Sequence, residues 1–120
     1  MSEILRNYFR SGICLSLSIF LLSFTVLATA EKPMSTVEKG HLLTKKLCQA
    51  CHVFNGATQA GTVAPPFASM KTRFPDRKKI RNIIYDAKVS NPDTMMPPFG
   101  RHGFVNEVEI NHIIDFLYTQ

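Results

Sequence analysis

Hydrophobic residues recur at helical spacing in three segments of the chain, and no stretch of useful length alternates as a β-strand does. The first segment follows Ser35, and Glu38 three residues later completes a capping-box pattern. This helix should run to about Cys51. Its apolar stripe is expected to consist of Val37, Leu43 and Leu47.

The second helix should begin near Pro75 and Asp76, and its apolar face repeats at i, i+3, i+4 and i+7, at Ile80, Ile83, Ile84 and Ala87. The third should be capped by Asn106, with a carboxylate at its third position. Its apolar residues are Ile110, Ile113, Ile114 and Leu117, flanked by Phe116 and Tyr118. Loops rich in glycine and proline, 55–66 and 90–103, separate these helices. The pattern predicts a small all-α domain whose long loops wrap a cofactor.

The first thirty residues have the pattern of an export signal. Residues 1–10 are net basic, residues 13–27 are uncharged and largely apolar, and residues 28–30 (Ala-Thr-Ala) form a small-x-small cleavage pattern. The apolar run is shorter than the roughly 20 residues that a membrane-spanning helix needs, which favours cleavage over a retained anchor. We expect residues 1–30 to be a cleaved secretory signal and residues 31–120 to form one domain in the periplasm.

The most specific chemistry lies in Cys48-Gln-Ala-Cys51-His52, because C-x-x-C-H is typical of covalent haem attachment. Two thiols one helical turn apart can each bond to one vinyl group of a porphyrin, and His52 can then ligate the iron. A zinc site would need about four ligands, and no second Cys/His pair follows. A thioredoxin-like disulfide would need a βαβ context, which the pattern lacks. The motif therefore predicts one covalent haem c on Cys48 and Cys51.

A sixth iron ligand is expected opposite His52, and methionine is the best candidate. Met96 directly precedes a double proline, which would stiffen the loop that holds a flexible thioether. Met95 is the alternative. Weaker candidates are Met34, Met70, His41, His102 and His112.

Two further residues are expected to support the site. The carbonyl group of Pro65 would accept a hydrogen bond from Nδ1–H of His52, which would fix the tautomer of the imidazole and increase its donor strength. Gly40 would let Phe116 or Tyr118 from the last helix approach the first helix closely. Such packing would explain a helix glycine that otherwise costs about 1 kcal/mol.

The formal net charge of the chain is +5. Residues 1–30 hold two of the 14 Lys and Arg and one of the 9 Asp and Glu, so removal of the signal leaves 12 against 8, about +4. Export argues against nucleic acid as the partner. A basic surface then fits an acidic redox protein, or serves only solubility.

Gly40, the C-x-x-C-H motif, the Pro65 loop, the methionine loop and the last helix together resemble a class I cytochrome c. The second half is more narrowly similar to the SoxX family, the mono-haem subunits of the SoxAX complexes of thiosulfate oxidation. Four segments carry this likeness: 73–77, 84–87, 91–103 with its Met-Pro-Pro-Phe-Gly-Arg-His-Gly string, and 113–118. The resemblance spans roughly residues 36–120, and Ala64 stands where the family pattern would have glycine.

The resemblance implies that His52 and Met96 ligate the iron and that Cys48 and Cys51 bind the haem. It implies a heterodimer with a SoxA-like haem subunit. Together the two would act as an L-cysteine S-thiosulfotransferase, which joins thiosulfate oxidatively to a cysteine of a SoxYZ-like carrier. This chain would pass the electrons to a downstream soluble cytochrome c. We expect no catalytic residue in it and no turnover by the chain alone.

Two other functions compete with this one. A free-standing periplasmic electron shuttle of the same fold would be a monomer with weak, salt-sensitive association. A thiol–disulfide oxidoreductase would use Cys48 and Cys51 and would carry no haem that survives denaturation.

Overall fold

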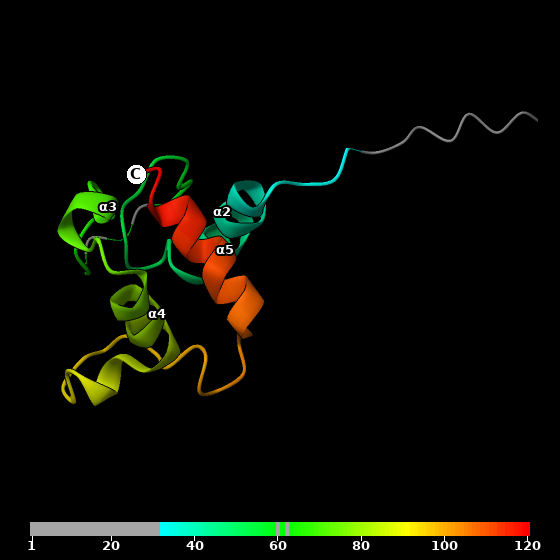
Figure 1. The fold of residues 1–120 in the computed structure, drawn as a ribbon. Helices are drawn as coiled ribbons and strands as arrows, with labels where there is room; N and C mark the ends of the chain where they lie inside the picture. The colour runs from blue at the N-terminus through cyan, green and yellow to red at the C-terminus, as the bar shows by residue number, and fades with distance from the viewer. Residues whose placement is uncertain (1–31, 60, 62) are drawn as a thin grey trace, which may run out of the picture. The chain divides into compact units, whose positions relative to one another are not determined.

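The helix predicted after Ser35 is α2, Thr36–Leu47, in a computed structural model that describes residues 32–59, 61 and 63–120 (Figure 1). The Ser35 side chain accepts a hydrogen bond from Glu38 N–H at 3.2 Å, and the Glu38 carboxylate accepts one from Ser35 N–H at 2.7 Å. The capping box is thus present. The export signal predicted for residues 1–30 lies outside the described residues.

α2 ends at Leu47, so the prediction that it reaches Cys51 was wrong. Cys48 is the C-cap, and Cys51 N–H donates to the Cys48 carbonyl at 3.1 Å instead of continuing the helical ladder to Leu47. The chain tightens into a turn here. The C-x-x-C-H motif therefore lies on the turn that follows the helix.

The two later helices begin where the sequence placed them. α4, Arg77–Asp86, is capped by the Asp76 side chain, which accepts from Lys78 N–H at 2.9 Å, and the short 3-10 helix η1, Ala87–Val89, follows it. α5, Glu107–Leu117, has Asn106 and Glu109 as a capping box. A four-residue helix, α3, Met70–Arg73, was not predicted, because four residues show no periodicity.

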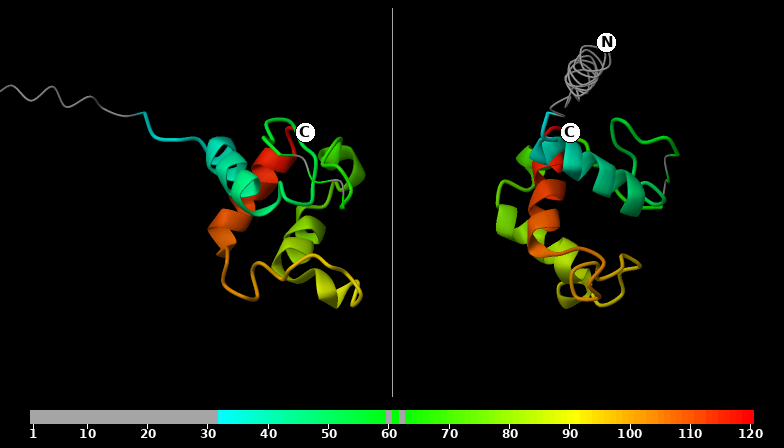
Figure 2. Two further views of the ribbon diagram at one scale, coloured as in Figure 1. Left: turned by 180° about the vertical axis from the view of Figure 1, so that it is seen from behind. Right: turned by 90° about the vertical axis from the view of Figure 1, so that its right-hand side faces the viewer.

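α2 and α5 pack directly against each other, and they cross in both views of Figure 2. A Cβ at Gly40 would lie 1.9 Å from the backbone oxygen of His112 and 2.9 Å from Cβ of Phe116. The expected close approach at Gly40 is therefore confirmed for Phe116, whereas the nearest atom belongs to the backbone of His112. Only glycine allows this crossing.

The buried stripe of α2 differs from the predicted one. Gly40 and Thr44 are its buried residues, Leu43 and Leu47 pack partly buried against the core, and Val37 is exposed. The apolar pattern missed Gly40 and Thr44, because a close helix crossing selects small residues rather than hydrophobic ones.

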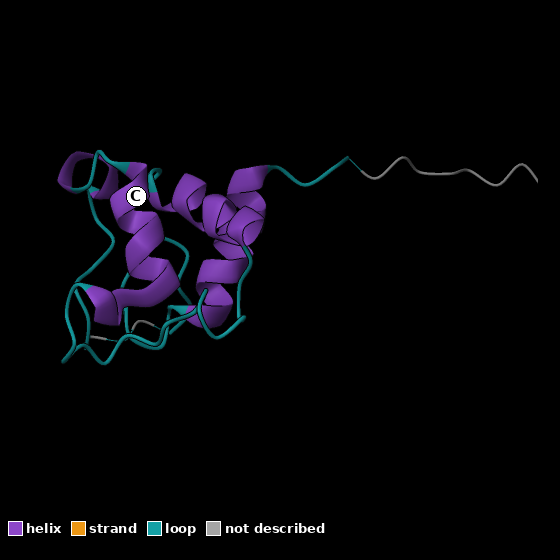
Figure 3. Cartoon of the chain, turned by 60° about the horizontal axis from the view of Figure 1, so that its bottom comes forward, coloured by secondary structure: helices purple, strands orange, loops and turns teal. Residues whose placement is uncertain are grey.

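The core lies between these helices. All four apolar positions predicted for α5 are buried, as are Ile80 and Ile84 of α4. Figure 3 shows only helices and loops in the described residues, which confirms the all-α fold class. None of the helices described is long and apolar enough to cross a membrane. Residues Pro33–Gln120 form one unit by themselves. In Figure 1 the segment between η1 and the start of α5 lies at the end of this unit remote from the carboxyl terminus.

Candidate functional site

The C-x-x-C-H motif forms the start of a loop, residues 48–67, that we call the histidine loop. Cys48 is half-buried and its N–H still donates to Thr44 O at 2.8 Å, so α2 fixes its position. Cys51 is exposed, and the two thiols are free rather than joined in a disulfide. His52 N–H donates to the Cys48 carbonyl at 2.9 Å, which keeps the histidine close to both cysteines.

The environment of Cys48 does not suit thiol–disulfide exchange. Burial, together with the neighbouring Cys51, raises the pKa of the Cys48 thiol to about 12. Redox-active cysteines need the opposite, a pKa lowered toward or below neutrality. In the described part of the chain no group of three or more Cys, His, Asp or Glu side chains is placed to hold a metal ion.

His52 is oriented by two contacts. Its Nδ1 lies 2.7 Å from the carbonyl oxygen of Pro65, and its ring stacks on Phe67 with 4.2 Å between centroids. Burial lowers the pKa of His52, partly opposed by the hydrogen bond to Pro65. The imidazole is therefore kept neutral, and since Nδ1 bonds to Pro65, Nε2 is the nitrogen left to bind iron.

Backbone hydrogen bonds close the histidine loop on itself. Gly61 N–H donates to Gln49 O at 3.0 Å, Ala64 N–H to Cys51 O at 3.0 Å, and Phe67 N–H to Val53 O at 2.9 Å. A Cβ at Gly61 would lie 2.0 Å from the carbonyl oxygen of Ala50. The Ala64 bond has an ordinary length, although the resemblance led us to expect glycine at this position. The loop is thus held largely by its own backbone, with a further hydrogen bond from Asn55 N–H to Oε1 of Gln120 at 2.8 Å.

The second loop, residues 90–105, carries both methionines, and we call it the methionine loop. Met95 is 86 % exposed, whereas Met96 is half-buried and packs against the hydrophobic core. Met96 N–H donates to Oγ1 of Thr94 at 3.2 Å, and Pro98 is buried. Of the two sulfur atoms, only that of Met96 belongs to a side chain that packs against the core.

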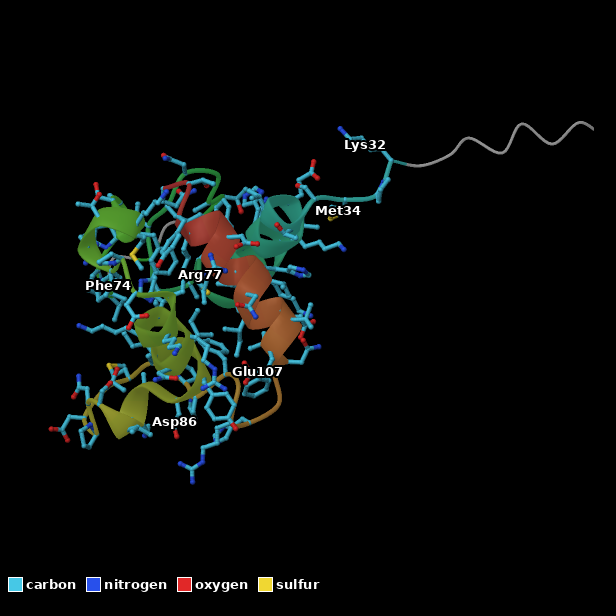
Figure 4. All side chains as sticks on the ribbon, viewed as in Figure 1. Lys32, Met34, Phe74, Arg77, Asp86 and Glu107 are labelled. Atoms are coloured by element: carbon cyan, nitrogen blue, oxygen red, sulfur yellow. The ribbon has the colours of Figure 1, made fainter. Side chains whose placement is uncertain are left out.

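Sequence reasoning missed one contact of the methionine loop. Asp86, at the end of α4, is buried and its Oδ2 accepts a hydrogen bond from Arg101 Nη1 at 3.0 Å. The pattern offered only a weak signal for it, a carboxylate directly before the last apolar position of the predicted helix. Asp86 is labelled where α4 gives way to η1 in Figure 4.

The weaker ligand candidates have other surroundings. His41 stacks on Phe116 with 4.9 Å between ring centroids, so it belongs to the helix crossing. Met70 is buried in the core, and His112 lies on α5 at the crossing. Met34 and His102 are exposed.

The donor set fits the haem expected from the sequence. Cys48 and Cys51 would hold the porphyrin through thioether bonds, and His52 would ligate the iron through Nε2. A bound haem supplies one-electron transfer, which none of these side chains performs alone at neutral pH. The chain's own contribution is to keep the imidazole neutral through burial and to orient it through Pro65 and Phe67.

Comparison with known proteins gives one family. The family model for cytochrome c matches residues 37–120, which is most of the chain and includes both loops. Searches of curated proteins and of solved structures each returned no match. The chain therefore belongs to the cytochrome c family, and its cofactor is haem c attached at Cys48 and Cys51.

Proposed function

We propose that this cytochrome c is the electron-transfer subunit of a thiosulfate-oxidising complex of the SoxAX type. Its haem accepts electrons when a SoxA-like partner joins thiosulfate to the carrier cysteine of a SoxYZ-like protein. It passes them on to a soluble cytochrome. The bond-making chemistry belongs to the partner, and the chain alone has no turnover.

One observation supports this more than any other: two of the segments that carry the SoxX resemblance contact each other. Gly100 and Arg101, from the Met-Pro-Pro-Phe-Gly-Arg-His-Gly string, pack against Tyr85 and Asp86 of the Ile-Tyr-Asp-Ala segment. A Cβ at Gly100 would lie 2.3 Å from Cδ2 of Tyr85. Residues that must fit one another form a more specific signature than either segment alone.

We assign the axial ligands as His52 and Met96. The support for Met96 is its packing against the core, in contrast to the 86 % exposed side chain of Met95. In the purified holoprotein, Met96→Ala should keep covalent haem, lose the absorption of the ferric iron–thioether bond, lower the reduction potential and admit external ligands. Met95→Ala is the matched control and should change none of these. The reverse result would make Met95 the ligand.

Export also belongs to this proposal. Class I cytochromes c are usually exported, and the first thirty residues have the pattern of a cleaved signal. The mature chain would then begin near Glu31 in the periplasm. Amino-terminal sequencing of the protein from a periplasmic fraction tests the cleavage site.

The partner assignment is tested by native mass spectrometry of the chain purified from the periplasm of cells that oxidise thiosulfate. The expected result is a complex with one larger haem-bearing subunit, and a mass increment of one haem on this chain. A lone chain with one haem would contradict the complex and leave a free-standing electron shuttle as the function. A basic surface and one haem would serve that role equally well.

A further inference from the structure

We propose that Asp86 and Arg101 are positioning residues that hold the methionine loop against α4 and thereby keep Met96 on the iron. The inference rests on the proposed ligation by Met96. It assigns control over the sixth ligand to an ion pair between the buried carboxylate of Asp86 and the exposed side chain of Arg101, remote in sequence from the haem-attachment motif.

Asp86 is the buried carboxylate of this region, with 5 % of its surface exposed. Its Oδ1 accepts Lys88 N–H at 3.1 Å and its Oδ2 accepts Arg101 Nη1 at 3.0 Å. A buried charge is costly unless it is paired and hydrogen-bonded, so both contacts are needed to keep the carboxylate there. One contact lies just before the methionine loop and the other near its end. The carboxylate thus ties together the two ends of the segment that contains Met96.

The backbone repeats this connection. Arg101 N–H donates to Tyr85 O at 3.0 Å and Gly100 N–H to Ile84 O at 3.4 Å. The Arg101 side chain is 67 % exposed, so its substitution leaves no cavity in the core. Breaking the ion pair should therefore loosen the loop while the fold of the helices persists.

The path from Arg101 back to Met96 is short and stiff. Pro97 and Pro98 follow Met96 directly, each with its φ angle fixed by the ring. Phe99 N–H donates to Pro97 O and His102 N–H to Pro98 O, each at 3.0 Å. Asp86, Met96 and Arg101 also line one cavity, of about 500 Å³. A displacement of Arg101 should therefore also displace Met96, because the segment between them is short and stiff.

The consequence is measurable through competition at the iron. An external ligand such as imidazole reaches the sixth position only in the fraction of molecules in which Met96 has moved away. Its apparent dissociation constant equals the intrinsic one divided by that fraction. Weakening the anchor raises the fraction, and the apparent affinity rises by the same factor.

The experiment titrates imidazole into ferric holoprotein and follows the absorption of the iron–thioether bond. Arg101→Gln and Asp86→Asn should each lower the apparent dissociation constant for imidazole by on the order of tenfold. Arg101→Lys, which keeps the positive charge, should bring this constant part of the way back to the wild-type value. The matched control is Arg77→Gln. It removes an ion pair between α4 and Asp115 of α5 that lies outside the methionine loop, and it should leave the imidazole affinity unchanged.

Two results would overturn the inference while the ligand assignment stands. One is an unchanged affinity in Arg101→Gln and Asp86→Asn, although Met96→Ala binds imidazole far more tightly than wild type. The other is an equal gain in imidazole affinity in Arg77→Gln, which would mean that any lost ion pair of α4 loosens the domain. If Met96→Ala keeps the thioether absorption and the wild-type affinity, the ligand assignment itself fails.

Discussion

The two loops that carry the proposed iron ligands differ in what holds them. The histidine loop is closed largely by hydrogen bonds within itself, such as that between His52 and the Pro65 carbonyl, and its two cysteines are placed for covalent attachment of the haem. The methionine loop is held by α4, through Asp86 and the backbone of Tyr85. The first ligand therefore depends on local sequence and covalent chemistry, and the second depends on tertiary structure. Damage to the histidine loop should affect haem attachment and folding, whereas damage to the methionine loop should affect ligand exchange and potential.

The largest effect is expected from Cys48→Ala combined with Cys51→Ala, which removes both attachment points. A domain of about 90 residues has a core that gives only a few kcal/mol of net stability, and a buried porphyrin would enlarge that core. The haem-free variant should lose cooperative unfolding, measured by circular dichroism during a thermal or urea titration. The comparison variant is Met96→Ala, which keeps covalent haem and should still unfold cooperatively. A cooperatively folded haem-free chain would show that the histidine loop does not need the attached haem in order to fold.

A matched pair of glycines separates the two loops more finely. A Cβ at Gly61 would meet the Ala50 carbonyl oxygen at 2.0 Å, and one at Gly100 would meet Tyr85 Cδ2 at 2.3 Å. Gly61→Ala and Gly100→Ala should each cost about 1–3 kcal/mol in the free energy of unfolding, because a well-packed contact must shift. Gly61→Ala should also lower the yield of holoprotein and leave its imidazole affinity normal. Gly100→Ala should leave the yield of holoprotein normal and raise the imidazole affinity.

The control for this pair is Gly103→Ala. Gly103 has a φ of +74°, and a Cβ there would meet nothing within 4 Å. Its substitution should cost about 1 kcal/mol from backbone strain alone and change neither haem yield nor imidazole affinity. Equal effects of Gly61→Ala and Gly100→Ala on both readouts would show that the loops are not independent.

The same division explains what the sequence could and could not predict. Local patterns were sufficient for the capping boxes at Ser35 and Asn106 and for the apolar face of α5, because their partners lie within a few residues. The hydrogen-bond acceptor for His52 was anticipated at Pro65, thirteen residues away in the same loop.

Contacts between distant elements were predicted less well. Val37 was assigned to a buried stripe that Thr44 occupies, since the choice depends on which face α5 covers. The pairing of Asp86 with Arg101 could not be predicted from periodicity. A charged residue beside an apolar helix face is normally taken to be solvent-exposed, and its partner is fifteen residues away. The predictable part of the site is therefore the histidine loop, whose contacts are mostly between residues close in sequence.

The smallest effect is expected at Asp115 on α5, which bridges the helices and touches neither loop. Its carboxylate accepts a hydrogen bond from Arg77 of α4 at 2.8 Å. Partial burial raises the pKa of Asp115, but hydrogen bonds from Thr36 and Arg77 outweigh it and lower the pKa below its ordinary value of 3.8. The unfolded chain therefore takes up the proton first as the pH falls. The stabilising contribution is complete above the unfolded-state pKa and is lost as the pH drops through the lower folded-state value.

Asp115→Asn should accordingly lower the free energy of unfolding by about 0.5 kcal/mol at neutral pH, the modest value typical of a partly exposed pair. Urea titrations of wild type and variant should show a constant difference above about pH 5 that shrinks below about pH 4. Adding Arg77→Gln to Asp115→Asn should cost less than the sum of the two single changes, because both remove the same interaction. Haem yield and imidazole affinity should not change in any of these variants. A change in haem yield or in imidazole affinity would mean that the contact between α4 and α5, and not α4 alone, sets the position of the methionine loop.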